Sequence, residues 1–173
     1  MASRPHVGVS SCLLGEAVRY DGTHRRMAWL VEGLGERVHL VSVCPEVGVG
    51  LGVPRPPIRL VERGGGVIVE RIEDGEDLTA AFEAWVGPCL DDLARLPLAG
   101  YVLKANSPSC GVETVPIHDD HGRVVASGDG LFAHALRRRW PRLPVVDERL
   151  LETGDARRAF EAAVFAYAEE VRP

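Results

Sequence analysis

The stretch Val38-His39-Leu40-Val41-Ser42-Val43-Cys44 is a short, nearly continuous apolar run that stops at a cysteine. A run of this length and composition predicts a β-strand buried on both faces, which is typical of a parallel sheet. Two further strands are predicted at residues 6–12 and 98–104. The first also stops at a cysteine, Cys12, and the second is followed by a short turn into Cys110. The three predicted strands therefore carry thiols at, or just after, their carboxyl ends.

Helical patterns separate these strands. A helix is predicted over residues 23–34, and apolar residues step by three or four along a longer helix at 77–96, which Pro88 is expected to kink or split. Two more helices are predicted at 130–140 and 155–171. Strands that alternate with helices predict an α/β fold whose mainly parallel, Rossmann-like sheet is flanked by helices.

The remaining segments are rich in turn-forming residues. Residues 45–57 contain too much glycine and proline for regular structure. Residues 58–61 and 66–71 predict a strand pair, and 112–127 predict a polar hairpin or loop. Because the sequence shows no internal repeat and no long linker, we expect one domain over residues 1–173, with a small hairpin insertion.

Composition and charge restrict the possible partners. The formal net charge is −5, so no global basic field attracts nucleic acid, and the basic run Arg137-Arg138-Arg139 is interpreted as a solvated helix face. No apolar run approaches the ~20 residues of a membrane span, and the first residues lack the apolar core of a signal peptide. We therefore expect a cytoplasmic protein without a membrane or nucleic-acid partner, in which cysteines are thiols or metal ligands rather than disulfides.

The three cysteines after the strands are candidate metal ligands. Open α/β sheets bind ligands at the carboxyl edge of their strands, where Cys12, Cys44 and Cys110 are expected to converge. Three thiolates suit zinc or an iron–sulfur cluster, and a ligand set that stops at three leaves a coordination position open. Cys89 instead lies on the apolar stripe of a predicted helix and is expected to be a core residue. A nucleophilic cysteine is the other chemical option, but no histidine forms a tight motif with a cysteine.

Six short motifs follow one another along residues 6–150: Val9-Ser10-Ser11-Cys12-Leu13-Leu14-Gly15, Arg19-Tyr20-Asp21-Gly22, Val43-Cys44-Pro45-Glu46, Pro54-Arg55-Pro56-Pro57, Leu103-Lys104-Ala105-Asn106-Ser107-Pro108-Ser109-Cys110-Gly111 and Gly128-Asp129-Gly130. Together they resemble the bacterial thiouracil desulfidase family. The resemblance implies a [4Fe–4S] cluster bound by Cys12, Cys44 and Cys110. It also implies non-redox removal of sulfur from thiolated uracils, which converts thiouracil or thio-UMP to uracil or UMP and hydrogen sulfide.

The resemblance also suggests roles for two polar residues. Glu46 of the C-P-E motif is expected to act as general base or acid, and Ser107 to assist, while the thiocarbonyl sulfur binds the open iron. Each has a simpler interpretation, since Glu46 can pair with Arg55 and Ser107 can serve turn geometry. Weaker candidates for substrate contacts are Asp21, Arg55, Lys104 and Ser109.

Two other classes of function remain open from the sequence. The chain can be a non-catalytic iron–sulfur sensor or regulatory protein, or a zinc-binding regulatory domain. If it is a desulfidase, the negative net charge and the apparent lack of a second domain favour a small thiolated pyrimidine over tRNA.

Overall fold

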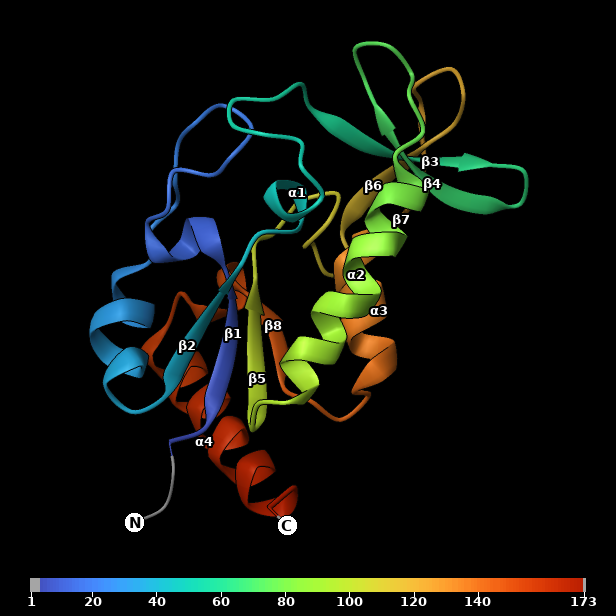
Figure 1. Cartoon of the computed structure of the whole chain (residues 1–173). Coiled ribbons are helices and arrows are strands. Elements are labelled where there is room, and N and C mark those ends of the chain that lie inside the picture. Colours follow the sequence, from blue (N-terminus) through green and yellow to red (C-terminus); the bar gives the residue numbers. More distant parts are fainter. Residues whose placement is uncertain (1–3, 173) are drawn as a thin grey trace.

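The computed structural model describes residues 4–172, so residues 1–3 and 173 of the expected domain lie outside the described range. It contains two four-stranded sheets with helices packed around them (Figure 1). The first sheet has the order β2-β1-β5-β8 and is parallel throughout, as predicted. Its strands are β1 (His6–Ser10), β2 (His39–Val43), β5 (Leu98–Leu103) and β8 (Val145–Asp147).

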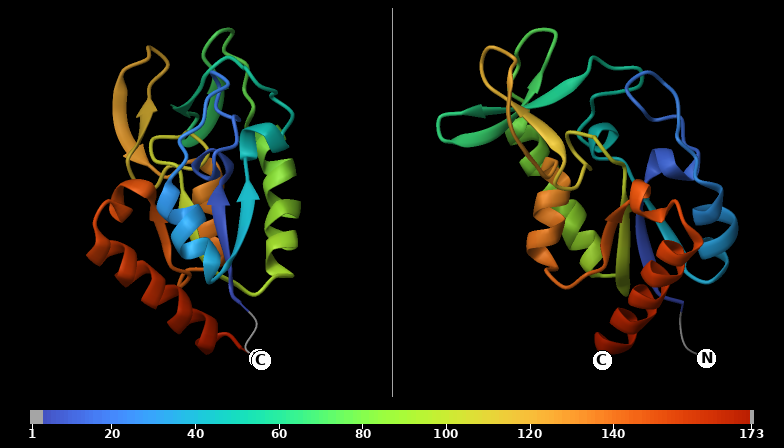
Figure 2. Two further views of the ribbon diagram at one scale, coloured as in Figure 1. Left: turned by 90° about the vertical axis from the view of Figure 1, so that its left-hand side faces the viewer. Right: turned by 180° about the vertical axis from the view of Figure 1, so that it is seen from behind.

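Helices cover both faces of this parallel sheet (Figure 2). One face packs against α4 (Gly154–Glu170), where Val7 and Val9 of β1 share a buried cluster with Phe160 and Val164. The other face packs against α2 (Thr79–Ala94) and α3 (Leu131–Arg139), in a cluster that includes Tyr101, Leu90 and Phe132. The sheet is therefore the middle layer of an α/β fold, in agreement with the sequence prediction.

The second sheet joins two hairpins in the order β4-β3-β6-β7. The hairpin of β3 (Ile58–Arg63) and β4 (Gly66–Arg71) was predicted, and β6 (Val115–His118) and β7 (Val124–Gly128) form the second. A parallel pair between β3 and β6 connects them, and this pairing was not foreseen from the sequence. Helix α2 begins in the core of the second sheet with Phe82 and continues into the core of the first with Leu90.

Short helices complete the chain between these elements. They are η1 (Ser11–Leu14), η2 (Trp29–Gly33), η3 (Leu34–Glu36), α1 (Pro45–Gly48) and η4 (Glu148–Leu151). Among residues 4–172, none of the helices combines the length and the apolar character that crossing a bilayer requires.

Local expectations were wrong at three places. The helix predicted over 23–34 starts only at Trp29, because the backbone N–H groups of Arg25 and Met27 donate to carbonyls of η1 instead. Strand β2 is not buried on both faces, because it forms an edge of the sheet. Residues 45–57 contain one helical turn, α1. Of the two expectations for Pro88, the split is excluded because α2 continues through it, and the kink stays a prediction.

Candidate metal centre and active site

A cavity of about 260 Å³ opens at the carboxyl edge of the parallel sheet. Cys12 reaches it from η1, directly after β1, and Cys44 from the N-cap of α1, directly after β2. Cys110 reaches it from the loop that follows β5. The parallel topology thus brings three thiols that are far apart in the sequence to the wall of one cavity.

Burial dominates the electrostatics of these thiols. It raises the pKa of Cys12 to about 11 and that of Cys110 to about 12, and it also raises the pKa of Cys44. The charge of Lys104 partly opposes the effect at Cys12, and hydrogen bonds from Ser10 and Ser109 partly oppose it at Cys110. All three are therefore neutral at pH 7 without a metal, and metal binding would release their protons.

The donor set fits an iron–sulfur cluster. Three soft sulfur ligands line a desolvated cavity, which is the environment that iron–sulfur clusters use. Within residues 4–172, no three histidine, cysteine or acidic side chains are gathered tightly enough to hold one metal ion. Cys89 is not among the residues that line this cavity, and it packs with the α2–α3 core as expected.

The loop that carries Cys110 is docked on the N-terminus of α3. The N–H groups of Leu131 and Phe132 donate to the carbonyls of Pro108 and Ser109, at 3.1 and 2.9 Å. These are helix-terminal donors without partners inside the helix, so the loop satisfies them. Within the loop, Ser107 Oγ accepts the backbone N–H of Cys110 at 3.1 Å. The simpler interpretation of Ser107, a role in turn geometry, is therefore present, and Ser107 also lines the cavity.

The motif Gly128-Asp129-Gly130 supports the same loop from the other side. Asp129 Oδ1 accepts the backbone N–H of Glu113 at 2.7 Å and pairs with Arg137 at 2.9 Å. Gly130 donates its N–H to the carbonyl of Gly111 at 2.8 Å. This motif therefore holds the residues that follow Cys110 in place.

Glu46 lies in the cavity wall and is held at both oxygens. Oε2 accepts from Nε and Nη2 of Arg55, at 2.8 and 2.6 Å, and Oε1 accepts from Ser109 Oγ at 3.1 Å. Ser109 Oγ is in turn 3.0 Å from Ser107 Oγ. The sequence offered two interpretations of Glu46, an ion pair with Arg55 and a position in the site. The structure has the ion pair and also has Glu46 in the cavity wall.

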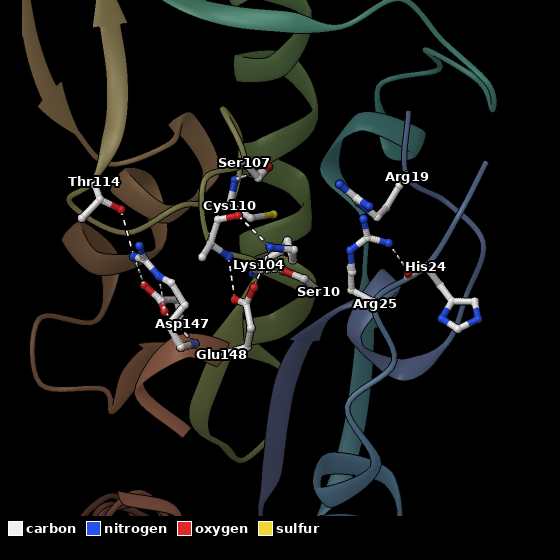
Figure 3. A network of polar contacts seen from close by, with 12 residues as sticks. Ser10, Arg19, His24, Arg25, Lys104, Ser107, Cys110, Thr114, Asp147 and Glu148 are labelled. Carbon is white, nitrogen blue, oxygen red and sulfur yellow. Dashed lines mark hydrogen bonds and ion pairs between the residues drawn. The ribbon is translucent and has the colours of Figure 1, made fainter. Parts of the chain in front are cut away.

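Lys104 is fixed below the Cys110 loop (Figure 3). Its Nζ donates to Glu148 Oε1 at 2.5 Å and to the carbonyl of Ala105 at 3.0 Å. Glu148 Oε2 also accepts the N–H of Ala105 at 2.6 Å, and Ser10 Oγ accepts the N–H of Lys104 at 2.9 Å. These contacts tie the carboxyl end of β5 to β1 and to η4.

Most of the residues predicted as site residues line this cavity, namely Cys12, Cys44, Glu46, Arg55, Lys104, Ser107, Ser109 and Cys110. Asp21 is not among the lining residues, because its carboxylate accepts from the N–H and the hydroxyl of Thr23, at 3.1 and 2.6 Å, and shapes a turn. Arg19 and Tyr20, which do line the cavity, were not proposed from the sequence. The signal that could have identified them is their position in the Arg-Tyr-Asp-Gly motif, directly before Asp21.

Comparisons with known proteins identify the family of this chain. The sequence model of the 2-thiouracil desulfurase family matches residues 7–148. The solved structure of the [4Fe-4S]-dependent thiouracil desulfidase TudS is 33% identical, with a TM-score of 0.69, and the match covers 92% of this chain and 99% of TudS.

A curated relative is the protein YbbK of Bacillus subtilis (strain 168), which is 28% identical over 134 residues. That match covers 75% of this chain and 87% of YbbK. The family match includes Cys12 and Cys44, which follow β1 and β2, as well as the Cys110 loop and the Gly128-Asp129-Gly130 motif. The chain therefore belongs to the 2-thiouracil desulfurase family.

Proposed function

We propose that this protein removes sulfur from thiolated uracils by hydrolysis at a [4Fe–4S] cluster held by Cys12, Cys44 and Cys110. The observation that carries the proposal is that the three thiols share one cavity with Glu46 and Ser107. The reaction exchanges the thiocarbonyl sulfur for the oxygen of water and releases hydrogen sulfide. When bound, a cluster with three protein ligands supplies one iron that can act as a Lewis acid on the C=S bond.

Glu46 is proposed as the general base. Its carboxylate is ion-paired with Arg55 and faces the cavity, so it can take a proton from an attacking water. Ser107 is proposed to donate or accept a hydrogen bond at the substrate or at the departing sulfur. Its Oγ is held by the backbone N–H of Cys110, which fixes its direction before substrate arrives.

The cavity suits a small pyrimidine, either as a free base or as its monophosphate. Arg19 and Lys104 line it, and Lys104 is neutralised by Glu148. The guanidinium of Arg19 is therefore the proposed contact for an anionic group of a nucleotide substrate. The basic run on α3 does not suggest a nucleic-acid surface, since Arg137 pairs with Asp129 and Arg139 with Asp91.

We also propose that the chain is one domain located in the cytoplasm. Support for a single domain comes from α2, which contributes Phe82 to the core of one sheet and Leu90 to that of the other. Support for the location comes from the four cysteines, which are free thiols, as expected in a reducing compartment.

Anaerobic reconstitution followed by sulfide-release assays tests the function. The reconstituted protein should contain about four iron and four sulfide per chain and release sulfide from 2-thiouracil, 4-thiouracil or thio-UMP. A cluster-loaded protein that releases no sulfide from any of them would support the alternative of a non-catalytic iron–sulfur sensor. A colourless protein that binds zinc in place of iron would contradict both.

A further inference from the structure

A buried arginine, Arg55, forms an ion pair with the carboxylate of Glu46. Arg55 is 8% exposed, and its Nε and Nη2 both donate to Glu46 Oε2, at 2.8 and 2.6 Å. Its remaining nitrogen, Nη1, donates to the carbonyl of Gly52 at 2.8 Å. All three nitrogens of the guanidinium are thus engaged by the protein, although the side chain borders the cavity.

The other oxygen of Glu46 has its own partner. Oε1 accepts from Ser109 Oγ at 3.1 Å, and Ser109 is 2% exposed. A carboxylate held at one oxygen can still turn about its terminal torsion, which has broad energy wells. With Arg55 on one side and Ser109 on the other, that rotation is blocked.

The segment from Glu46 to Arg55 is shaped to bring these two residues together. After α1 the chain reverses through Gly50 and Gly52, which have φ angles of +89° and +78° that favour glycine. The N–H of Leu51 donates to the carbonyl of Glu46 at 3.1 Å and closes the turn. The glycine- and proline-rich stretch therefore folds back on itself and places the guanidinium of Arg55 beside the carboxylate of Glu46.

The same segment is bonded to the loop that carries Tyr20. The N–H of Arg55 donates to the carbonyl of Tyr20 at 2.9 Å, and Tyr20 lines the cavity. The backbone of Arg55 thus connects the two loops that flank the site, while its side chain holds Glu46.

We propose that Arg55 is a positioning residue that acts through Glu46 and does not touch the substrate. It fixes the carboxylate so that one oxygen stays on the guanidinium and the other faces Ser109 and the cavity. The inference rests on the proposed function, because it requires Glu46 to act on the attacking water. A displacement of about 1 Å at such a group costs on the order of 10²-fold in rate.

A double-mutant cycle separates positioning from substrate contact. We expect Arg55→Met to lower kcat by about 10²-fold, with KM nearly unchanged. In the Glu46→Gln background the same change should add little, because the group through which Arg55 acts is already lost. Losses that multiply in the double variant, or a raised KM with kcat intact, would overturn the proposal in favour of direct substrate contact.

Control variants distinguish the effect from a loss of stability. Arg55→Met leaves the Glu46 carboxylate without its counter-charge, which costs stability, whereas the double variant removes both charges. Arg59→Met removes one of the two arginines that pair with Glu70 in the second sheet, outside the cavity, and should leave kcat unchanged. A fall in kcat for Arg59→Met as large as that for Arg55→Met would contradict a specific role for Arg55.

Crystal structures of the cluster-loaded wild type and Arg55→Met provide a readout that needs no turnover. We expect the carboxylate of Glu46 to leave Ser109 in the variant; a carboxylate that stays within about 0.5 Å of its original place overturns the proposal. If the wild type releases no sulfide, the proposed function fails, and this comparison still decides whether Arg55 positions Glu46. If Arg55→Met does not fold, the kcat of Glu46→Gln is compared with that of the double variant Glu46→Gln/Arg55→Met. A large further loss in the double variant then overturns the proposal.

Discussion

Gly130 lies directly against the backbone of Ser109. A Cβ atom at Gly130 would be 2.5 Å from the carbonyl carbon of Ser109 and 2.8 Å from the nitrogen of Cys110. Both atoms are backbone, so neither can move aside without moving the loop that carries the proposed cluster ligand. The close approach explains why the loop and the N-terminus of α3 can share hydrogen bonds.

Gly130→Ala is therefore expected to displace Ser109 and Cys110. The reconstituted variant should bind substoichiometric iron, and the cluster it holds should be lost faster in air. Iron analysis and the visible absorbance of the cluster measure both effects. A variant with full iron content and wild-type oxygen stability would show that the loop tolerates the added methyl group.

Gly87→Ala is the matched control for that substitution. Gly87 lies within α2, and a Cβ there would meet no atom within 4 Å other than those of its chain neighbours and of the adjacent helix backbone. The added methyl group should change the free energy of unfolding by less than about 1 kcal/mol, because the gain from replacing a helical glycine is opposed by its contact with the ring of Pro88. Thermal denaturation checks this, and iron content should not change.

The proposed ligand set makes a second prediction. Replacing Cys12, Cys44 or Cys110 with serine should abolish stable cluster binding, because each contributes one of only three thiolates. Cys89→Ser should retain the cluster, since Cys89 packs in the α2–α3 core instead. Iron and sulfide analysis of the four variants decides, and loss of the cluster in Cys89→Ser alone would mean that the ligands are misassigned.

Acid stability is expected to depend on Glu70. Hydrogen bonds from Arg63 and Arg59 lower the pKa of this buried carboxyl, although burial itself opposes the shift. A carboxyl with a lowered pKa stabilises the folded state above its ordinary pKa of 4.5, and this stabilisation is lost as the pH falls through the lowered value.

The Glu70→Gln variant should be less stable than the wild type at pH 7, by about 1–3 kcal/mol. As the pH falls below 4.5 the two should converge, because the unfolded wild type then takes up a proton at Glu70 that the folded state binds only at lower pH. Denaturation curves between pH 7 and pH 3 measure this. Glu62→Gln, at an exposed position of β3, is the control and should remain close to the wild type.

Arg19 offers a test of the substrate class. Its guanidinium donates to Thr23 Oγ1 at 3.3 Å and lies on the cavity wall. If the substrate is a nucleotide, Arg19→Gln should raise KM for thio-UMP by about tenfold, which corresponds to 1.4 kcal/mol, and leave KM for free thiouracil unchanged. Added salt should weaken thio-UMP binding in the wild type more than in the variant. Equal effects on both substrates would argue against a phosphate contact at Arg19.

The sequence alone predicted the parallel sheet, its helices and the thiols at its carboxyl edge. These features are local: apolar runs set strands, a 3.6-residue period sets helices, and the alternation of the two sets the layer order. The edge position of β2 could not be predicted in this way, because strand order depends on contacts between distant segments. The start of η2 at Trp29 escaped prediction for the same reason, since the preceding backbone is bonded to η1.

What only the tertiary structure decided is which polar residues meet. The sequence left open whether Glu46 and Arg55 form an ion pair or act as separate site residues. It suggested Ser109 only as a weaker candidate for a substrate contact. The fold places all three in one hydrogen-bonded array and leaves Asp21 out of it, in a turn with Thr23, because loop reversals and helix termini position side chains. Strand ends determine where the thiols converge. The loops that fold back over them determine which carboxylate faces the cavity and which arginine holds it.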